Sequence, residues 1–140
     1  YGSTRAWDAG NGEMLHVINS ASSADGHHWH REGLAVPYEL GLAQAFSRPT
    51  VVEDAGGYGM WFSYRGGGGQ KYRIGYAFSD DGAKWQLDLN ACGIDVSSDG
   101  WDSEMIEYPY VFDHNGQRYM LYNGNGYGKT GFGLAVLSNE

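Results

Sequence analysis

The sequence predicts an all-β protein in which short strands are joined by tight turns. Of its 140 residues, 23 are Gly, 11 are Tyr, 5 are Trp and 5 are Phe. Gly supplies the positive φ angles that turns need, and aromatic residues are enriched in strands. The glycines lack the every-third-residue period of collagen, so they are expected to mark turns. Hydrophobic residues make up 41% of the chain, which is enough for a packed core.

A motif of the form S-x-D-G-x-x-W occurs twice in the chain. It covers residues 23–29 and 79–85, which begin 56 positions apart. In such a motif Ser and Asp bond nearby backbone N–H groups, Gly supplies a positive φ, and Trp packs beneath the turn. The motif therefore predicts a hairpin that stabilises the fold, and its Asp and Trp residues are poor candidates for an active site.

Strand-like runs recur with nearly the same period. Residues 48–52 and 59–64 flank a Gly-Gly turn, and about sixty positions later residues 108–112 and 119–123 flank an Asn-Gly turn. Two further runs match each other in the same way: 73–77 and 131–135. Turns of this type are strong hairpin signals. Tandem units of three or four strands predict the blades of a β-propeller, and the alternative is a two-sheet β-sandwich.

At a period of 56–60 residues, the chain has room for about two and a half four-stranded antiparallel blades. We assign residues 1–46 to the end of one blade and its connection, 47–106 to a second blade and its connection, and 107–140 to an incomplete third blade. An open arc of blades leaves apolar faces and strand edges uncovered. Self-association into a homo-oligomer is therefore expected.

The charge balance argues against several classes of protein. The net charge is −8, so the basic footprint of a nucleic-acid binder is missing, and a membrane-surface role is unsupported. No apolar run approaches the roughly 18–20 residues that a membrane-spanning helix needs. Cys92 is the single cysteine, which excludes an internal disulfide. The His27-His28-x-His30 tract overlaps the first hairpin motif and offers too few ligands for zinc, so no metal is predicted. No cofactor is predicted either. The sequence does not predict the cellular compartment of the protein.

Four segments carry a resemblance to a known family: 47–51, 60–66, 73–79 and 100–126. They resemble the five-bladed β-propeller glycosidase superfamily, which includes arabinanase/xylosidase-type and invertase/levansucrase-type enzymes. They look most like uncharacterised bacterial glycosidase-like proteins of that clan. The resemblance extends from about residue 1 to 136 and implies the C-terminal half of such a fold. The opening blades, which carry an acidic nucleophile or base in the family, then have no counterpart in this sequence.

The resemblance makes Glu107 the main catalytic candidate. Glu107 is followed by Tyr and Pro, and this segment is similar to the Glu-x-Pro segment that carries the general acid in invertase-like and arabinanase-like families. Glycoside hydrolysis needs a carboxyl with a raised pKa and a second carboxylate, about 5–5.5 Å away for retention or about 6.5–9.5 Å for inversion. Asp102 and Glu104 are close in sequence and are candidates for that second group. The alternative is that Glu107 forms a structural ion pair with Arg48 or Arg65.

Arg48 stands directly before Pro49, where the family has the Asp of an Arg-Asp-Pro motif. The two Pro-led runs are expected to be the innermost strands, with Arg48 and Glu107 at equivalent positions of neighbouring blades. A guanidinium at this place can bind a carboxylate or phosphate on a sugar. Aromatic rings stack on sugars, and amides bond their hydroxyls. The candidate substrate-binding residues are Arg48, Arg65, Tyr64, Trp101, Tyr108, Tyr122, Asn123 and Asn125, each of which can also serve the fold instead.

The sequence as a whole predicts a glycosidase-like β-propeller protein directed at carbohydrate. If the chain is active, carboxylate acid/base chemistry would hydrolyse a glycoside. The alternative is a non-catalytic carbohydrate-binding or self-assembling half-propeller module.

Overall fold

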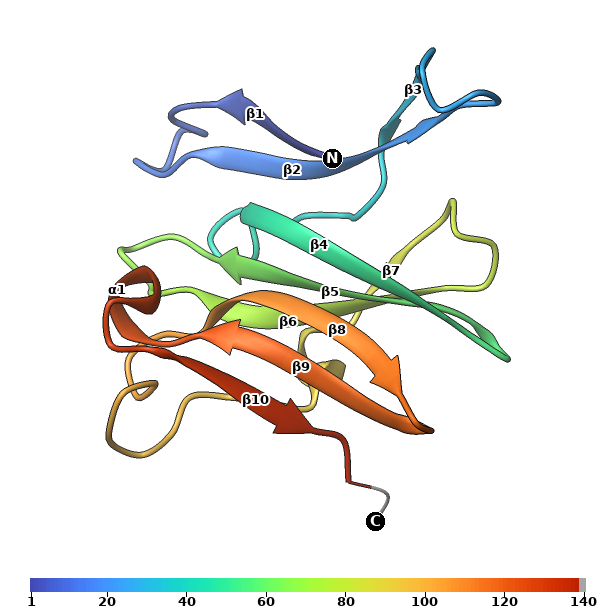
Figure 1. Cartoon of the computed structure of the whole chain (residues 1–140). Helices are drawn as coiled ribbons and strands as arrows, with labels where there is room; N and C mark the ends of the chain where they lie inside the picture. The colour runs from blue at the N-terminus through green and yellow to red at the C-terminus, as the bar shows by residue number, and fades with distance from the viewer. Residues whose placement is uncertain (139–140) are drawn as a thin grey trace.

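The computed structural model describes residues 1–138, and these form a stack of antiparallel strands (Figure 1). The strands are β1 (Gly2–Ala6), β2 (Leu15–Ser22), β3 (His30–Leu34), β4 (Ala45–Asp54), β5 (Gly57–Arg65), β6 (Arg73–Ser79), β7 (Gln86–Leu87), β8 (Glu107–His114), β9 (Gln117–Asn123) and β10 (Phe132–Val136). A 3₁₀ turn (Leu89–Cys92) and a single helical turn, α1 (Asn125–Gly128), lie in the connections. The predicted fold class, an all-β partial propeller, is confirmed.

Figure 1 shows three groups of strands lying one upon another: β1–β3, β4–β7 and β8–β10. Within each group, successive strands pair antiparallel. The first two groups also meet through one parallel bridge, between His16 of β2 and Ala45 of β4. All six predicted strand runs fall inside observed strands or begin one residue before them, because the turns between them have the chemistry that hairpins require.

Two hydrophobic cores fill the spaces between the groups. The first joins β2 to the β4–β7 group through Ile18, Phe46, Phe62 and Trp85, among others. The second joins the β4–β7 group to β8 and β9 and contains Trp61, Ile74, Ile106, Val111, Met120 and Tyr122. β5 belongs to both cores because successive side chains of a strand point to opposite faces. The middle group is therefore buried on both of its faces.

The S-x-D-G-x-x-W turns form as predicted at the backbone. The Asp25 carboxylate accepts hydrogen bonds from the backbone N–H groups of residues 27 and 28, and Asp81 does the same for residues 83 and 84. These bonds, together with the His28 side chain at Asp25, hold the pKa values of both carboxyls below their usual range. Both Asp side chains therefore hold the backbone of their own turns.

The prediction for the two Trp residues of this motif is wrong for one of them. Trp85 is buried in the first core, whereas Trp29 is 62% exposed. Trp85 belongs to the same core cluster as Ile18 of the preceding group of strands. Among residues 1–138 no group of strands precedes β1–β3 in the stack, so Trp29 has nothing equivalent to pack against (Figure 1).

An ion-pair cluster ties the second and third groups together at one end of the stack. Arg118 of β9 donates to both carboxylate oxygens of Asp54 at 2.7 and 2.9 Å, and to Asp113 at 2.8 Å. Its guanidinium also lies over the Trp61 ring at 5.7 Å. Hydrogen bonds to the two carboxylates raise the pKa of Arg118 well above its usual value. Because β9 runs from Gln117 to Asn123, this cluster is at the opposite end of the strand from Glu107, which pairs with Asn123.

Candidate functional site

The candidate site forms around two matching bulges at the starts of β4 and β8. In β4 the pairing with β5 is regular up to Ser47 and resumes at Thr50; in β8 the pairing with β9 is interrupted between Glu107 and Tyr110. Ser47 is thus the structural counterpart of Glu107, and Arg48 is the counterpart of Tyr108. The predicted equivalence of Arg48 and Glu107 is wrong by one residue, because Pro49 and Pro109 occupy equivalent places and Glu107 stands two residues before its proline.

Both bulges have strained backbones. Arg48 has φ 49° and Tyr108 has φ 54°, in the left-handed region that non-glycine residues rarely adopt. Proline follows each of them, and a proline disfavours the helical region for the residue before it. The second bulge is held by two hydrogen bonds to the neighbouring group: Tyr108 N–H donates to Ser63 Oγ, and the Thr50 hydroxyl donates to the Pro109 carbonyl, both at 2.7 Å.

Glu107 is a buried carboxyl without a partner. Its side chain has no exposed surface, and neither carboxyl oxygen has a hydrogen-bond partner among residues 1–138. Burial raises the pKa of Glu107 to about 7, although the nearby Arg48 charge acts in the opposite direction. The alternative of a structural ion pair between Glu107 and Arg48 or Arg65 is wrong within the described residues, because no guanidinium nitrogen lies within 4 Å of a Glu107 carboxyl oxygen. A carboxyl of this kind keeps its proton in a large fraction of molecules near neutral pH and can donate it.

Arg48 and Tyr108 lie against each other beside this carboxyl. The Arg48 guanidinium sits 4.5 Å from the centre of the Tyr108 ring, a cation–π contact between the two bulges. Burial raises the pKa of Tyr108, and the Glu107 charge adds to this shift. The three predicted residues Arg48, Glu107 and Tyr108 are thus brought together by the fold. Asn123, also predicted, pairs with Glu107 across β8 and β9.

A pocket of about 330 Å³ opens near this group. It is lined by Arg65, Gly69, Gln70, Lys71, Tyr72, Glu104, Met105, Gly126 and Tyr127. Tyr72 and Tyr127 both contribute to the raised pKa of Tyr108, after burial and Glu107, so the pocket is within electrostatic reach of the bulges. Arg65 forms an ion pair with Glu13 at 2.7 Å, so its charge is neutralised within the fold. Glu104, predicted as a second carboxylate, faces this pocket.

Asp102 and two of the predicted aromatic residues pack together inside the third group. Tyr122 donates its hydroxyl to Asp102 at 2.9 Å, and burial together with this bond raises the Tyr122 pKa to about 12. The Trp101 ring stacks on Tyr122 with centroids 5.5 Å apart. Trp101 also fills the space over Gly124 and Gly133, where a Cβ would collide with the indole. The contacts of these three side chains serve packing.

The remaining predicted residues also have contacts that serve the fold. Asn125 uses its side-chain oxygen to accept from the N–H groups of Glu104 and Met105, and its amide donates to the Gly100 carbonyl. It thereby fixes the 100–105 loop that presents Glu104. Tyr64 is half-buried, packs against the first core and lines a different pocket together with Arg73.

Three residues of the site escaped the sequence analysis. Ser63 pins the second bulge, yet it lies in an apolar strand run that predicts only packing. Tyr72 and Tyr127 line the pocket with ring centroids 6.2 Å apart, but they come from loops 55 positions apart in sequence. One feature of the sequence could have indicated Tyr127 as a site residue: it lies in a Gly-rich loop, Gly-Asn-Gly-Tyr-Gly, directly after a strand.

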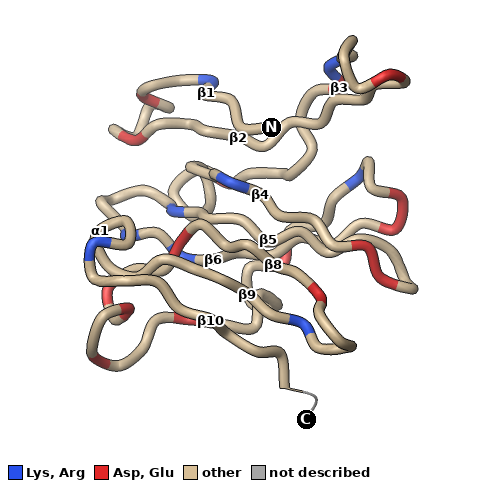
Figure 2. Tube along the Cα trace, in the orientation of Figure 1, with Lys and Arg blue, Asp and Glu red and all other residues tan. Residues whose placement is uncertain are grey.

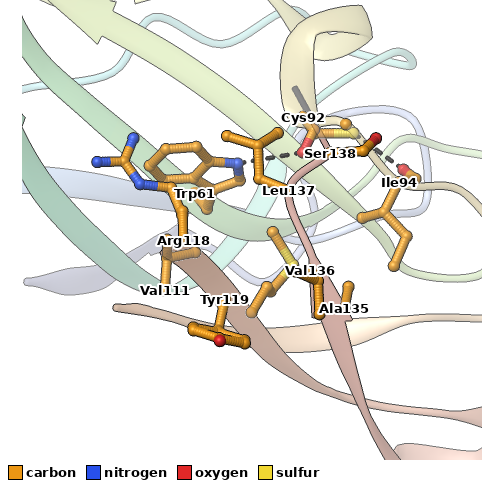
Figure 3. Close-up of a pocket in the computed structure, with 12 residues that line it drawn as sticks. Trp61, Cys92, Ile94, Val111, Arg118, Tyr119, Ala135, Val136, Leu137 and Ser138 are labelled. Atoms are coloured by element: carbon orange, nitrogen blue, oxygen red, sulfur yellow. Dashed lines mark hydrogen bonds between the residues drawn. The ribbon is translucent and has the colours of Figure 1, made fainter. Parts of the chain in front are cut away.

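Another cavity lies at the far end of β9 (Figure 3). It holds about 120 Å³ and has a mostly apolar lining from β5, β8, β9, β10 and the 92–94 turn. The Trp61 indole donates to the Cys92 carbonyl at 3.1 Å, and the Cys92 thiol donates to the Ile94 carbonyl at 3.0 Å. Burial raises the pKa of Cys92, which disfavours the reactive thiolate form.

Charged residues are scattered over the chain, with basic and acidic segments together at the end where α1 lies (Figure 2).

Within residues 1–138, no group of three or more His, Cys, Asp or Glu residues is arranged to hold a metal ion. His28 of the histidine tract instead lies 2.6 Å from Asp25. No helix of the described chain is long and apolar enough to cross a membrane.

Comparison with known sequences finds close relatives that are longer than this chain. No family model matches the sequence. Two curated proteins of Mycobacterium tuberculosis, Uncharacterized protein MT1551 of strain CDC 1551 and Uncharacterized protein Rv1502 of strain H37Rv, are each 54% identical to it over 140 residues. The alignment covers 99% of this chain and 46% of each relative, so the chain spans about half the length of the curated relatives it matches.

Comparison with solved structures identifies the fold as that of β-propeller glycoside hydrolases. A protein described as "Glycoside hydrolase" superposes with a TM-score of 0.68 and 20% identity, covering 97% of this chain and 39% of its own. The GH32 β-fructofuranosidase BmSUC1 of Bombyx mori gives 0.64 and 19% identity, over 97% and 30%. A thermostable family-43 glycoside hydrolase gives 0.60 and 20% identity, over 76% and 33%. The chain therefore has a glycosidase-like fold.

Proposed function

We propose that this chain is part of a carbohydrate-directed, glycosidase-like protein in which Glu107 acts as the general acid. The observation that carries the proposal is the environment of Glu107: a fully buried carboxyl, without a hydrogen-bond partner among residues 1–138, beside the cation–π pair of Arg48 and Tyr108. Burial raises its pKa to about 7, so it holds a proton at the pH where a glycosidic oxygen needs one. The glycosidase-like fold supports the same substrate class.

Glu104 is the better candidate for a second carboxylate within this chain. It lines the same pocket as Tyr72 and Tyr127, and the hydrogen bond from its backbone N–H to the Asn125 side chain fixes its backbone. Asp102, the other candidate, is 5% exposed and bonded to Tyr122. A carboxylate committed to a tyrosine hydroxyl inside a packed group is poorly placed to meet a sugar or a water.

Substitution of Glu107 by Gln tests the acid role. With alkyl glycosides, whose leaving groups need protonation, the rate is expected to fall about 10²–10⁴-fold, the usual contribution of general acid catalysis. With dinitrophenyl glycosides, whose dinitrophenolate leaving group departs without being protonated, the loss of rate should be far smaller. The wild-type rate should also fall as the pH rises through about 7, and this limb should vanish in the variant.

Glu53→Gln is the control, because it removes the same charge from an exposed position of β4. Equal losses for both leaving-group classes in Glu107→Gln would contradict the acid role. If the wild type binds sugars without turning them over, the second candidate function, a non-catalytic binding module, is favoured instead. The hydrogen bond that Asp102 accepts from Tyr122 also favours this second function.

A self-assembling module is the other form of this second candidate, and the outer face of the β8–β10 group supports it. The register places Tyr110, Leu121 and Leu134 next to one another on that face. Phe132 is 75% exposed there, and Tyr110, Leu134 and Val136 are each more than half exposed. An uncovered apolar sheet face of this kind favours association with another surface.

Sedimentation velocity at micromolar concentration is expected to show a species larger than the monomer. Leu134→Asp should shift the population toward monomer, because a carboxylate on the contact face must be desolvated. Leu40→Asp, which alters an equally exposed leucine in the loop before β4, is the control. A wild type that stays monomeric over this range would rule the association out.

A further inference from the structure

Arg48 is an arginine that the fold does not neutralise. Arg65 bonds Glu13 at 2.7 Å, Arg73 lies 3.2 Å from Asp95, and Arg118 bonds two aspartates. Arg48 by contrast is exposed, and within residues 1–138 it has no carboxylate oxygen within 4 Å. Its guanidinium lies over the Tyr108 ring, 4.5 Å from the ring centre. A charge-assisted donor is therefore free at the edge of the site.

The fold holds this donor in place at a cost in backbone strain. A non-glycine residue at φ near +50° is unfavourable by about 1–3 kcal/mol, and such residues cluster at functional sites. Here two of them, Arg48 and Tyr108, support each other's side chains across neighbouring groups of strands. Ser63 and Thr50 pin the second bulge from the adjacent group. The planar guanidinium is thus preorganised against a rigid ring, which reduces the entropy lost on binding.

We propose that Arg48, stacked on Tyr108, binds the carboxylate of an acidic sugar whose ring occupies the site beside Glu107. This inference rests on the proposed function, since it names the substrate class of the same site. A guanidinium fork matches the two oxygens of a carboxylate in a bidentate pair. The neighbouring Glu107 carboxyl does not compete for the guanidinium, because burial keeps it largely protonated below pH 7.

A carboxylate fits this site better than a phosphate. One unpaired guanidinium can balance one negative charge, whereas a sugar phosphate carries nearly two. The other arginine nearby, Arg65, is already paired with Glu13. The chain as a whole carries a net charge of −8, which further disfavours a doubly charged ligand.

Calorimetric titration with matched sugar pairs tests the proposal. The probes are glucuronic acid against glucose, galacturonic acid against galactose, and glucose 6-phosphate as the phosphate arm. We expect the wild type to bind at least one uronic acid about tenfold or more tightly than its neutral partner, as expected for one hydrogen-bonded charge pair. Arg48→Gln should bring that ratio close to one, and Arg48→Lys, which keeps the charge but not the fork, should restore it only in part. Arg5→Gln, which removes an exposed arginine from β1, should leave the ratio unchanged.

The outcomes separate this inference from the proposed function. Equal binding of neutral and acidic sugars would overturn the inference while leaving a carbohydrate site intact. An Arg48-dependent preference for the sugar phosphate would overturn the carboxylate assignment. Failure of every sugar to bind would overturn both proposals.

Discussion

At about pH 8, Glu107→Gln is expected to be more stable than the wild type by on the order of 3 kcal/mol. The pKa of Glu107 is about 7 in the folded protein, because burial disfavours its charge, against 4.5 as the ordinary value. Below about pH 4.5 the carboxyl is protonated in both states, and its ionisation costs the folded protein nothing. Between about pH 4.5 and 7 the unfolded chain loses the proton first, so stability falls; above about 7 the penalty is constant.

Urea unfolding at a series of pH values between about 4 and 8 measures this difference. The wild-type and Glu107→Gln free energies of unfolding should converge at the acid end and separate as the pH rises. Glu53→Gln controls for the loss of a negative charge at an exposed position. A constant difference across the range would show that Glu107 is not buried as a neutral carboxyl. A stability gain paired with lost catalysis would instead mark Glu107 as a residue kept for function.

Phe62→Ala is expected to lower the free energy of unfolding by about 3–5 kcal/mol. Phe62 has no exposed surface and lies at the centre of the first core, in edge-to-face contact with Phe46 at 5.2 Å between ring centroids. Its truncation removes buried apolar area and leaves a cavity between the first and second groups of strands. A single domain is stable by only about 5–15 kcal/mol, so this change takes a large share of the total.

Leu40→Ala, which truncates a leucine that is 51% exposed, is the control and should change stability by less than about 0.5 kcal/mol. The midpoint of urea unfolding at constant slope gives both values. A loss below about 1 kcal/mol for Phe62→Ala would mean that the first core is not packed as described.

The repeated turns were the most predictive part of the sequence. Their Ser, Asp and Gly residues bond atoms two or three positions away, so the information needed is local. The strand runs could be predicted for the same reason, since each is bounded by a turn whose type depends on its own residues. Trp29 and Trp85 mark the limit of such local information: they have identical motifs, yet their burial differs because only one has a group of strands beside it.

The candidate site was predictable in part. Glu107, Arg48 and Tyr108 were named from the sequence, and the structure brings them together. The predicted equivalence of Arg48 and Glu107 was wrong by one residue: the strand register shows that Ser47 opposes Ser63 as Glu107 opposes Asn123. Asp102, Tyr122 and Trp101 have the residue types of a sugar site, but their contacts are with one another.

By itself the sequence determined the all-β class, the repeated units and the turns between strands, because these depend on contacts between residues close in the chain. Tertiary structure decided which charged groups are neutralised and which are left free. Arg65 meets Glu13 from 52 positions away, whereas Arg48 meets a tyrosine and Glu107 meets no polar partner. The free charge and the buried carboxyl arise from packing between blades, which no local pattern in the sequence encodes.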